Sequence, residues 1–380
     1  MTWPLKKLGN VCDILDSKRK PITKSKRIAG EFPYYGATGI VDFVNDYIFN
    51  ERLVLVGEDG AKWKSGDKTA FIVEGKTWVN NHAHVLRPHS ELNDSFLTYY
   101  LNHQDLTYYI TGLTVPKLNQ ERLRSIPIPV PTLSEQQQIV ENLDTAFDLI
   151  DRAKANIEKN IQNAKELFQS KLIDVFQNYD NHKFEVKKIK DISTILGDGL
   201  HGTPVYDNNG EYYFINGNNL ISEKIIFKDN TKRVNESQFL KYKKVLNDRT
   251  ILVSINGTLG NVAFYNGEKV ILGKSACYFN LKEEYDKRYI MYQIKSPIFI
   301  KYAHKEATGA TIKNVSLKSM RDYNVVIPKN LAIQKMIVTQ LDLLSTQTDL
   351  LQQKYKQKLA NLEELKKSIL EKAFKGELVH

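Results

Sequence analysis

The chain has 380 residues, of which 42% are hydrophobic and 26% charged, so it can build two or three domains with sizeable cores. Lys and Arg exceed Asp and Glu by 54 to 44, and this net charge of +10 suits a polyanionic partner, either nucleic acid or an anionic membrane surface. Two cysteines exclude a disulfide framework and a cysteine-based zinc site, and the sequence has neither an apolar run long enough for a membrane span nor a signal-peptide core. We expect a soluble cytoplasmic protein that faces nucleic acid.

Residues 1–132 mix short β-rich runs with glycine turns, which indicates a first globular domain of α/β type. Residues 53–56 ahead of Gly57 are typical of a strand followed by a turn, and residues 94–102 favour a helix. The densest basic stretch of the chain lies at residues 17–27 and has no acidic member. A phosphate-binding loop and a solvated loop explain it equally well. Its basic residues are Lys18, Arg19, Lys20, Lys24, Lys26 and Arg27.

Residues 133–182 predict a long helix, because residues 136–178 contain no Gly and no Pro. Prolines precede this segment, and Ser134 and Glu135 resemble a helix-start signal. A helix of about 42 residues spans roughly 63 Å, far more than the core of a small domain needs. Apolar residues recur at the heptad spacing of a coiled coil. They are Leu143, Ala146, Ile150, Ala153, Ile157, Ala164 and Leu167.

Residues 183–330 predict a second globular domain, and residues 331–380 a second long helix with a short tail. Its apolar stripe comprises Leu341, Leu344, Leu351, Tyr355, Leu362, Leu365 and Ile369. At an offset of 198, nine of the 34 residues from 143 to 176 are identical to those from 341 to 374, against about two expected from background frequencies. The chain is therefore a tandem duplication.

The connectivity predicts how the two long helices pair. Only residues 179–182 link the first helix to the second domain, so the matching stripes can cover each other only if the helices run antiparallel. The fold class we expect is α+β or α/β: two globular domains separated by an antiparallel coiled coil, with pseudo-two-fold symmetry. Two separate helical hairpins or a homodimeric coil are the alternatives. Charges in residues 136–178 and 334–374 cancel, so the net positive charge belongs to the globular parts and connectors.

Two matched segments just before the long helices are net basic and rich in Thr and Gly. They are residues 111–124 and 308–321, and their recurrence in both copies favours contact with nucleic acid over surface decoration. The glycine turns at residues 57–64 and 256–261 could bring the backbone near DNA, although hairpin geometry explains the glycines equally well. Further candidate DNA-binding residues are Lys62, Lys64, Thr111, Lys117, Arg122, Arg124, His201, Asn256, Thr258, Thr308, Lys313, Lys318 and Arg321.

The sequence offers no catalytic constellation. An amino-methyltransferase needs an [N/D/S]-P-P-[Y/F/W] motif, and no two prolines are adjacent in the chain. Residues 267–275 differ from a phosphate-binding loop, because five residues separate the glycines where four are needed. His82 and His84 have the spacing of metal ligands on a strand, but no third ligand is evident nearby, and a polar strand face is the better interpretation.

The sequence resembles the specificity (S) subunits of type I restriction–modification systems over essentially its whole length. Residues 126–140 read IPIPVPTLSEQQQIV, similar to the family's "iPlPPLxEQxxIv" entry to a helix, and residues 374–378 read FKGEL, similar to its "FxGEL" ending. GTP at residues 202–204 and INGTLG at residues 255–260 resemble segments of the family's target recognition domains. The second copy keeps Pro328 and Gln334 but has Ile333 where the first has Glu135.

The resemblance implies two target recognition domains that read the halves of an asymmetric bipartite sequence in double-stranded DNA. It implies that the helices set the spacer and dock two methyltransferase (M) subunits, which bind S-adenosylmethionine and methylate adenine. Restriction (R) subunits would join for cleavage, and this chain would hold no cofactor or metal and catalyse nothing. Two rival hypotheses remain from the residues alone: a coiled-coil scaffold whose basic heads bind RNA or an acidic protein, and an enzyme with an unrecognised site.

Overall fold

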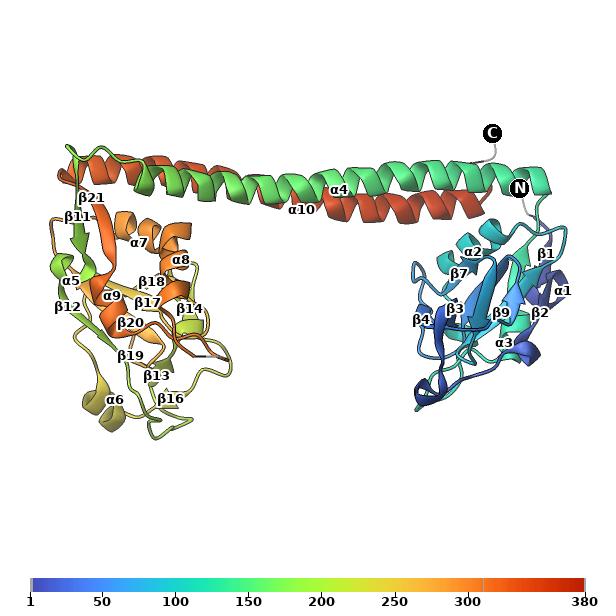
Figure 1. Cartoon of the computed structure of the whole chain (residues 1–380), viewed down its shortest axis with the longest axis horizontal. Helices are drawn as coiled ribbons and strands as arrows, with labels where there is room; N and C mark the ends of the chain where they lie inside the picture. The colour runs from blue at the N-terminus through green and yellow to red at the C-terminus, as the bar shows by residue number, and fades with distance from the viewer. Residues whose placement is uncertain (1–2, 310, 379–380) are drawn as a thin grey trace. The chain divides into compact units, whose positions relative to one another are not determined.

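The computed structural model describes residues 3–309 and 311–378 (Figure 1). The chain forms two compact units, Met1–Glu158 with Lys356–His380, and Lys159–Tyr355. Each unit contains one globular domain and parts of both long helices. We call residues 3–132 domain 1 and residues 183–330 domain 2.

Domain 1 contains two four-stranded sheets and three short α-helices. The first sheet is antiparallel throughout, with the order β2 (Cys12–Ile14), β9 (Ala83–Pro88), β6 (Leu53–Gly57), β7 (Ala70–Val73). The second is mixed, with the order β4 (Gly39–Val44), β3 (Ala29–Gly36), β8 (Lys76–Val79), β5 (Phe49–Asn50), and β3 runs parallel to β8. The pair β1 (Leu5–Lys7) and β10 (Pro127–Pro129) and the helices α1 (Leu8–Val11), α2 (Asp94–His103) and α3 (Gln120–Ser125) complete it.

Strand β6 lies at the centre of domain 1, which explains its continuous apolar sequence. Val54 and Val56 pack in a cluster with Phe96 of α2, whereas Leu53 and Leu55 pack in a separate cluster that includes residues of the second sheet. Successive side chains of a strand point to opposite faces, so a strand covered on both faces needs apolar residues at every position.

Domain 2 repeats this arrangement. Its four-stranded antiparallel sheet has the order β12 (Ser193–Asp198), β20 (Ala276–Leu281), β17 (Thr250–Ser254), β18 (Val262–Phe264). A three-stranded sheet has the order β16 (Arg233–Val234), β13 (Tyr212–Ile215), β19 (Val270–Leu272), with β13 parallel to β19. The remaining elements are the pairs β11 (Phe184–Lys188) with β21 (Asn324–Pro328) and β14 (Leu220–Ile221) with β15 (Lys224–Ile225), and helices α5 (Ile189–Ile192), α6 (Glu236–Tyr242), α7 (Lys287–Lys295), α8 (Pro297–Glu306) and α9 (Leu317–Asp322). The duplication seen in the sequence is thus a duplication of the fold.

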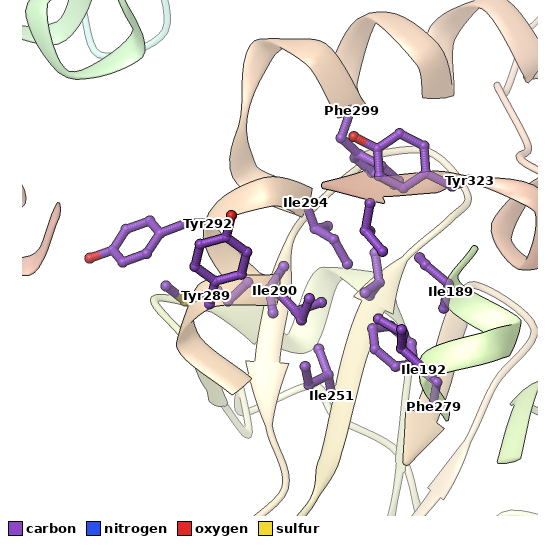
Figure 2. Close-up of a cluster of buried hydrophobic side chains, with 14 of the residues drawn as sticks. Ile189, Ile192, Ile251, Phe279, Tyr289, Ile290, Tyr292, Ile294, Phe299 and Tyr323 are labelled. Atoms are coloured by element: carbon purple, nitrogen blue, oxygen red, sulfur yellow. The ribbon is translucent and has the colours of Figure 1, made fainter. Parts of the chain in front are cut away.

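The core of domain 2 lies between the four-stranded sheet and its helices (Figure 2). Ile251 of β17 and Phe279 of β20 are fully buried against Ile290 and Ile294 of α7 and against Ile192 of α5. Helix α8 adds Phe299, whose ring packs edge-to-face with the Tyr323 ring, with 4.9 Å between the ring centroids. Rigid packing of this kind is what holds the loops at the edge of the sheet in place.

The long helices are α4 (Leu133–Gln177) and α10 (Leu331–Phe374). Helix α4 begins with a capping box: the Thr132 N–H donates to the Glu135 carboxylate (2.8 Å), and the Glu135 N–H donates to the Thr132 hydroxyl (3.3 Å). Thr132 therefore caps the start of the helix, two residues before the predicted signal at Ser134. Helix α10 has Ile333 at the matching position, and the Asn330 side chain instead accepts from the Ala332 N–H (2.8 Å).

A buried glutamine ties each long helix to its domain. The Gln136 amide donates to the Pro131 carbonyl (2.9 Å) and accepts from the Asn93 N–H (2.7 Å), at the start of α2. Gln334 donates to the Pro328 carbonyl (3.1 Å) and accepts from the Asp286 N–H (2.8 Å), at the start of α7. The Pro and Gln shared by the two copies therefore serve one structural purpose, the attachment of a helix start to a globular domain.

Both long helices bury a stripe whose spacing alternates between four and three residues. On α4 these positions are 143, 147, 150, 154, 157, 161, 164 and 168, and on α10 they are 341, 345, 348, 352, 355, 359, 362 and 366. We call the contact between these two stripes the seam. Of the predicted coiled-coil residues, five lie on the stripes: Leu143, Ile150, Ile157, Leu341 and Leu362. The prediction was wrong for three others, which are exposed on 57%, 40% and 47% of their surface: Leu167, Leu351 and Leu365.

The error has a definite cause. The second position of each heptad lies four residues after the first, not three, so Phe168 faces inward and Leu167 outward. On α10 the true second positions include Ser345, Gln352 and Lys366, and polar residues give no apolar signal.

The two helices pair antiparallel within each unit. In the first unit, Lys154 forms an ion pair with Glu363, and the Lys366 ammonium lies 4.5 Å from the centroid of the Phe147 ring. In the second unit, Phe176 of α4 shares a cluster with Leu341 of α10. Early residues of one helix therefore face late residues of the other, as the connectivity predicted. Among the described residues, no helix is both long and apolar enough to cross a membrane.

Candidate nucleic-acid interface

Each domain carries a short closed loop just before the helix that precedes its last strand. In domain 1, Thr111 and Lys117 exchange backbone hydrogen bonds of 2.9 and 2.8 Å, and in domain 2, Thr308 and Asn314 exchange bonds of 3.0 and 2.9 Å. We call residues 111–117 closed loop 1 and residues 308–314 closed loop 2; Ala310 lies outside the described residues. Gly112 has φ +90°, and a Cβ there would lie 2.4 Å from the Val115 carbonyl oxygen, so the loop requires glycine.

Each closed loop is joined to the turn that follows the central strand of its sheet. The Leu118 N–H donates to the Glu58 carbonyl (2.8 Å) in domain 1, and the Val315 N–H donates to the Ile255 carbonyl (2.8 Å) in domain 2. Asp59 and Asn256 also form β-bridges with Lys117 and Asn314 respectively. The two segments singled out in the sequence of each copy, the Thr/Gly-rich segment and the glycine turn, thus form one surface.

Most of the predicted DNA-binding residues on and around these surfaces are exposed to solvent. The glycine turns, closed loops and adjoining helices α3 and α9 present side chains that a DNA backbone can reach. Three apolar residues, Leu113, Val115 and Ile312, are also exposed. The exposed predicted residues here are Lys62, Lys64, Arg122, Arg124, His201, Thr258, Thr308, Lys313, Lys318 and Arg321. Thr111 and Asn256 are partly buried.

The basic stretch at residues 17–27 divides into two groups. Its four lysines, Lys18, Lys20, Lys24 and Lys26, are exposed. Arg19 and Arg27 expose only 12% and 18% of their side chains, and we therefore withdraw them as phosphate ligands. Arg27 pairs with Asp42 (3.0 Å) and lies 4.4 Å from the centroid of the Tyr34 ring. Its hydrogen bond to Asp42 lowers the pKa of that carboxyl group.

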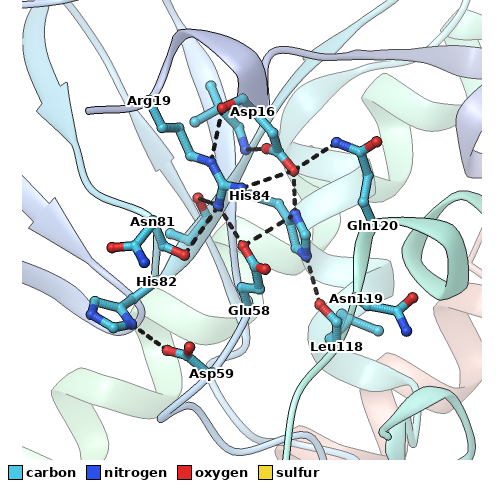
Figure 3. Close-up of polar contacts among 12 residues, drawn as sticks. Asp16, Arg19, Glu58, Asp59, Asn81, His82, His84, Leu118, Asn119 and Gln120 are labelled. Carbon is cyan, nitrogen blue, oxygen red and sulfur yellow. Dashed lines mark hydrogen bonds and ion pairs between the residues drawn. The ribbon is translucent and has the colours of Figure 1, made fainter. Parts of the chain in front are cut away.

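Arg19 belongs to a buried polar network beneath closed loop 1 (Figure 3). Its guanidinium contacts the carboxylates of Asp16 (3.3 Å) and Glu58 (2.5 Å), and the Lys117 ammonium reaches Glu58 at 2.7 Å. Lys117 is therefore also held by the protein itself. Gln120 of α3 donates to Asp16 (3.0 Å), so the network ties together the basic stretch, the glycine turn, closed loop 1 and α3.

His84 lies at the centre of this network, and both of its ring nitrogens have hydrogen-bond partners. Its Nδ1 lies 2.6 Å from the Asp16 carboxylate, and its Nε2 lies 2.7 Å from the Leu118 carbonyl oxygen. Burial by itself would raise the pKa of Asp16, but the hydrogen bonds from His84, Gln120 and the Val85 N–H outweigh it and lower the pKa below 3.8.

The same residues do not fit a metal site, although their geometry suggests one. Ligand atoms of Asp16, Glu58 and His84 lie within 4.8 Å of one another. Asp16 and Glu58 both already bind the Arg19 guanidinium, however, Glu58 also binds the Lys117 ammonium, and both ring nitrogens of His84 already have hydrogen-bond partners. The histidine pair considered in the sequence also separates: His82 is exposed and contacts Asp59, whereas His84 is fully buried.

Domain 2 has a cavity of about 500 Å³ beside closed loop 2. Strand register places Cys277 where domain 1 has His84, and the matching backbone hydrogen bonds place Ile255 where domain 1 has Glu58. The charged network of domain 1 thus has no equivalent at these two positions. The cavity is lined by polar residues that include Asp198, His201, Asn256, Lys274, Asn314 and Ser316.

Sequence reasoning missed the residues that hold these surfaces together. Asp16, Glu58 and His84 are far apart in the chain, and only the fold makes them neighbours. Asn314 could have been found, because it aligns with the predicted Lys117 at the offset that relates Thr111 to Thr308.

Comparison with known proteins identifies the family. The family described as Type I restriction modification DNA specificity domain matches residues 1–163 and 181–361. The chain belongs to this family. It is accordingly a DNA specificity protein of a type I restriction–modification system, a component that recognises DNA and does not itself catalyse methylation or cleavage.

The relatives share this description. A putative type I restriction enzyme specificity subunit of Haemophilus influenzae is 40% identical over 139 residues, which cover 37% of this chain and 36% of that protein. A putative type I specificity subunit of Mycoplasma pneumoniae is 25% identical over 346 residues, or 88% of this chain and 87% of that protein.

Solved structures show the same fold at low sequence identity. One from a study of complex assembly and conformational transition of the type I R-M system has a TM-score of 0.74 at 17% identity and covers 99% of this chain and 98% of its own. The HsdS subunit from Thermoanaerobacter tengcongensis has a TM-score of 0.61 at 17% identity, and the match covers 99% of this chain and 97% of that chain.

Proposed function

We propose that the chain reads an asymmetric, bipartite DNA sequence, one half with each domain. The observation that carries this proposal is the matched pair of closed loops, built on the same sheet order but with different residues at equivalent positions. Lys117 is matched by Asn314 and Asp59 by Asn256. Equal frameworks with unequal surfaces are suited to two unequal half-sites.

Exposed basic residues near the closed loops supply the sequence-independent part of the affinity. Lys62 and Lys64 lie on the turn joined to closed loop 1, and Lys313 and Lys318 lie in and just after closed loop 2. Cations placed beside reading loops neutralise phosphates and fix the register of the protein on the duplex. The proposed role places the protein in the cytoplasm, on DNA.

The long helices are proposed to dock the catalytic partners. Each contains exposed apolar residues outside its seam, among them Leu149 and Leu167 on α4 and Leu343 and Leu350 on α10. Because the helices derive from a duplication, each is proposed to dock one of two M subunits. Those subunits would bind S-adenosylmethionine and methylate adenine, and R subunits would complete a cleaving complex.

The test is the selection of duplexes from a randomised library by the full chain with its M subunits, together with methylome sequencing of a host that carries them. We expect one motif with two unlike halves and a fixed spacer, and affinity that falls steeply with salt. Equal binding to scrambled duplex would contradict the proposal and favour the rival scaffold whose basic heads bind RNA or an acidic protein.

A further inference from the structure

Two asparagines from distant parts of the chain form a pair beside the cavity of domain 2. Asn256 follows strand β17 and Asn314 ends closed loop 2, and a β-bridge joins their backbones. The Asn256 Nδ2 donates to the Asn314 Oδ1 (3.3 Å). Within the described part of the chain, this is the one hydrogen bond that either side chain makes. Both residues are partly exposed and line the cavity of about 500 Å³.

The pair leaves a defined set of hydrogen-bonding groups unused. An asparagine amide offers one oxygen acceptor and one NH₂ donor group. Their mutual bond uses one of the two N–H donors of Asn256 and one of the two lone pairs of the Asn314 oxygen, so the Asn256 oxygen and the Asn314 NH₂ group are the two groups that remain wholly unused. Rotating both amides by 180° exchanges these roles but still leaves one oxygen and one NH₂ group wholly unused, so the conclusion is independent of how the amides are oriented.

One base in the major groove matches this set. Adenine presents the N7 acceptor beside the N6 amino donor, whereas guanine presents two acceptors, cytosine one donor, and thymine one acceptor with a methyl group. The charge around the cavity also suits a polyanion, because Lys274 is exposed on its wall and Asp198 is paired with His201 at 2.6 Å.

Domain 1 lacks this set at the matched positions. Asp59 contacts His82, and the Lys117 ammonium is bound to Glu58 at 2.7 Å. Domain 2 therefore has a neutral amide pair beside a cavity. At the matched positions domain 1 has the charged side chains of Asp59 and Lys117, next to the buried polar network of Asp16, Glu58 and His84.

We infer that Asn256 and Asn314 are specificity-determining residues of domain 2, and that together they read one adenine through its major-groove edge. The inference rests on the proposed function and adds to it a named base, a named half-site and the two side chains that read it.

The first test needs no variant. The full chain with its M subunits selects its preferred duplex, and each adenine of that duplex is replaced in turn by 7-deazaadenine, which lacks the N7 acceptor, or by purine, which lacks the amino group. At one adenine, confined to one half of the motif, we expect either analogue to weaken binding by about tenfold. A half-site without adenine, or adenines that tolerate both analogues, would overturn the inference.

The second test changes the hydrogen-bonding set itself. Asn314→Asp replaces the remaining donor by an acceptor, so the pair presents two acceptors, which suit the cytosine amino group. We expect the wild-type preference for adenine over cytosine at this position to reverse, with the other half of the motif unchanged. Asn208→Asp is the matched control, because it adds the same charge at an exposed residue of domain 2 outside the cavity lining and should keep the adenine preference.

The outcomes separate the two proposals. If Asn314→Asp keeps an intact bipartite motif with adenine at the same place, the asparagine pair does not read it, and the proposed function survives. If the wild-type chain selects no bipartite motif, the proposed function itself fails. Thermal unfolding of the variant shows whether a lost preference reflects altered reading or a damaged domain.

Discussion

At the scale of single residues, the two domains hold their closed loops by different means. Domain 1 buries the charged groups of Asp16, Arg19 and Glu58, together with the His84 ring, under its loop. Domain 2 has the buried Cys277 at the position of His84, and burial raises the pKa of its thiol, which keeps it uncharged. Buried ionic groups require all of their partners, so domain 1 depends on each member of its network.

Arg19→Met should destabilise domain 1 by about 3–5 kcal/mol, because it leaves the buried Asp16 and Glu58 with fewer cationic partners. All three tryptophans, Trp3, Trp63 and Trp78, lie in domain 1, so urea unfolding followed by tryptophan fluorescence reports on this domain. Lys20→Met is the control and should change stability by less than about 0.5 kcal/mol, because Lys20 is exposed. Equal effects of the two substitutions would show that the network contributes nothing.

Domain 1 should also lose stability in acid. The pKa of Asp16 in the folded state is lower than its ordinary 3.8, so the ionised carboxylate stabilises the fold above pH 3.8, and this contribution is lost as the pH falls through the lowered value. Tryptophan fluorescence between pH 5 and pH 2 should show a stability that falls below about pH 3.8. In Asp16→Asn this dependence should be weaker, and a slope equal to that of the wild type would exclude Asp16 as its source.

At the scale of elements, the register of the long helices decides which leucines matter. Leu341 is buried in the seam and Leu343, two residues later, is largely exposed. Leu341→Ala should therefore cost about 2–5 kcal/mol, and Leu343→Ala less than about 0.5 kcal/mol. Chemical unfolding followed by far-UV circular dichroism measures both. A larger loss at Leu343 would place the seam on the wrong face of α10.

Closed loop 2 and α9 should contribute phosphate contacts through Lys313 and Lys318, which are both exposed. Replacement of both by Ala should weaken DNA binding and reduce the slope of log affinity against log salt by about one for each lost contact. Lys372→Ala, on the exposed surface of α10, removes a positive charge elsewhere and should leave the slope unchanged. An unaltered slope in the double variant would remove these lysines from the interface.

At the scale of the whole molecule, α4 and α10 each run from one compact unit into the other. Seven residues added to both helices preserve the heptad register and lengthen each by about 10.5 Å. If the helices set the distance between half-sites, the preferred spacer should lengthen by up to about three base pairs, as read from duplexes selected by the lengthened protein. Insertion into one helix alone should instead disrupt pairing, and an unchanged spacer after both insertions would refute the role of the helices as a ruler.

The sequence by itself determined the duplication, the two long helices, their antiparallel pairing and the net positive charge of the globular parts and connectors. These properties follow from local features of the sequence. They are the repeat at a fixed offset, the absence of Gly and Pro from the helical segments, and the charges that cancel within those segments. The family resemblance rested on the same local signals, and the Pro and Gln that carry it proved to be the residues that fasten each helix to its domain.

Tertiary structure alone decided which polar side chains face solvent and which face each other. Lys18 and Arg19 are neighbours in one basic stretch, yet Lys18 is exposed and Arg19 points inward, where it pairs with Asp16 and Glu58. No local sequence pattern distinguishes the two residues. Phe168 rather than Leu167 enters the seam for a similar reason, since the partner helix selects the face. The amide pair of Asn256 and Asn314 exists because a turn and a loop 58 residues apart meet at the end of the central strand β17. Contacts of this kind depend on partners remote in the chain, and only the folded backbone brings them within reach.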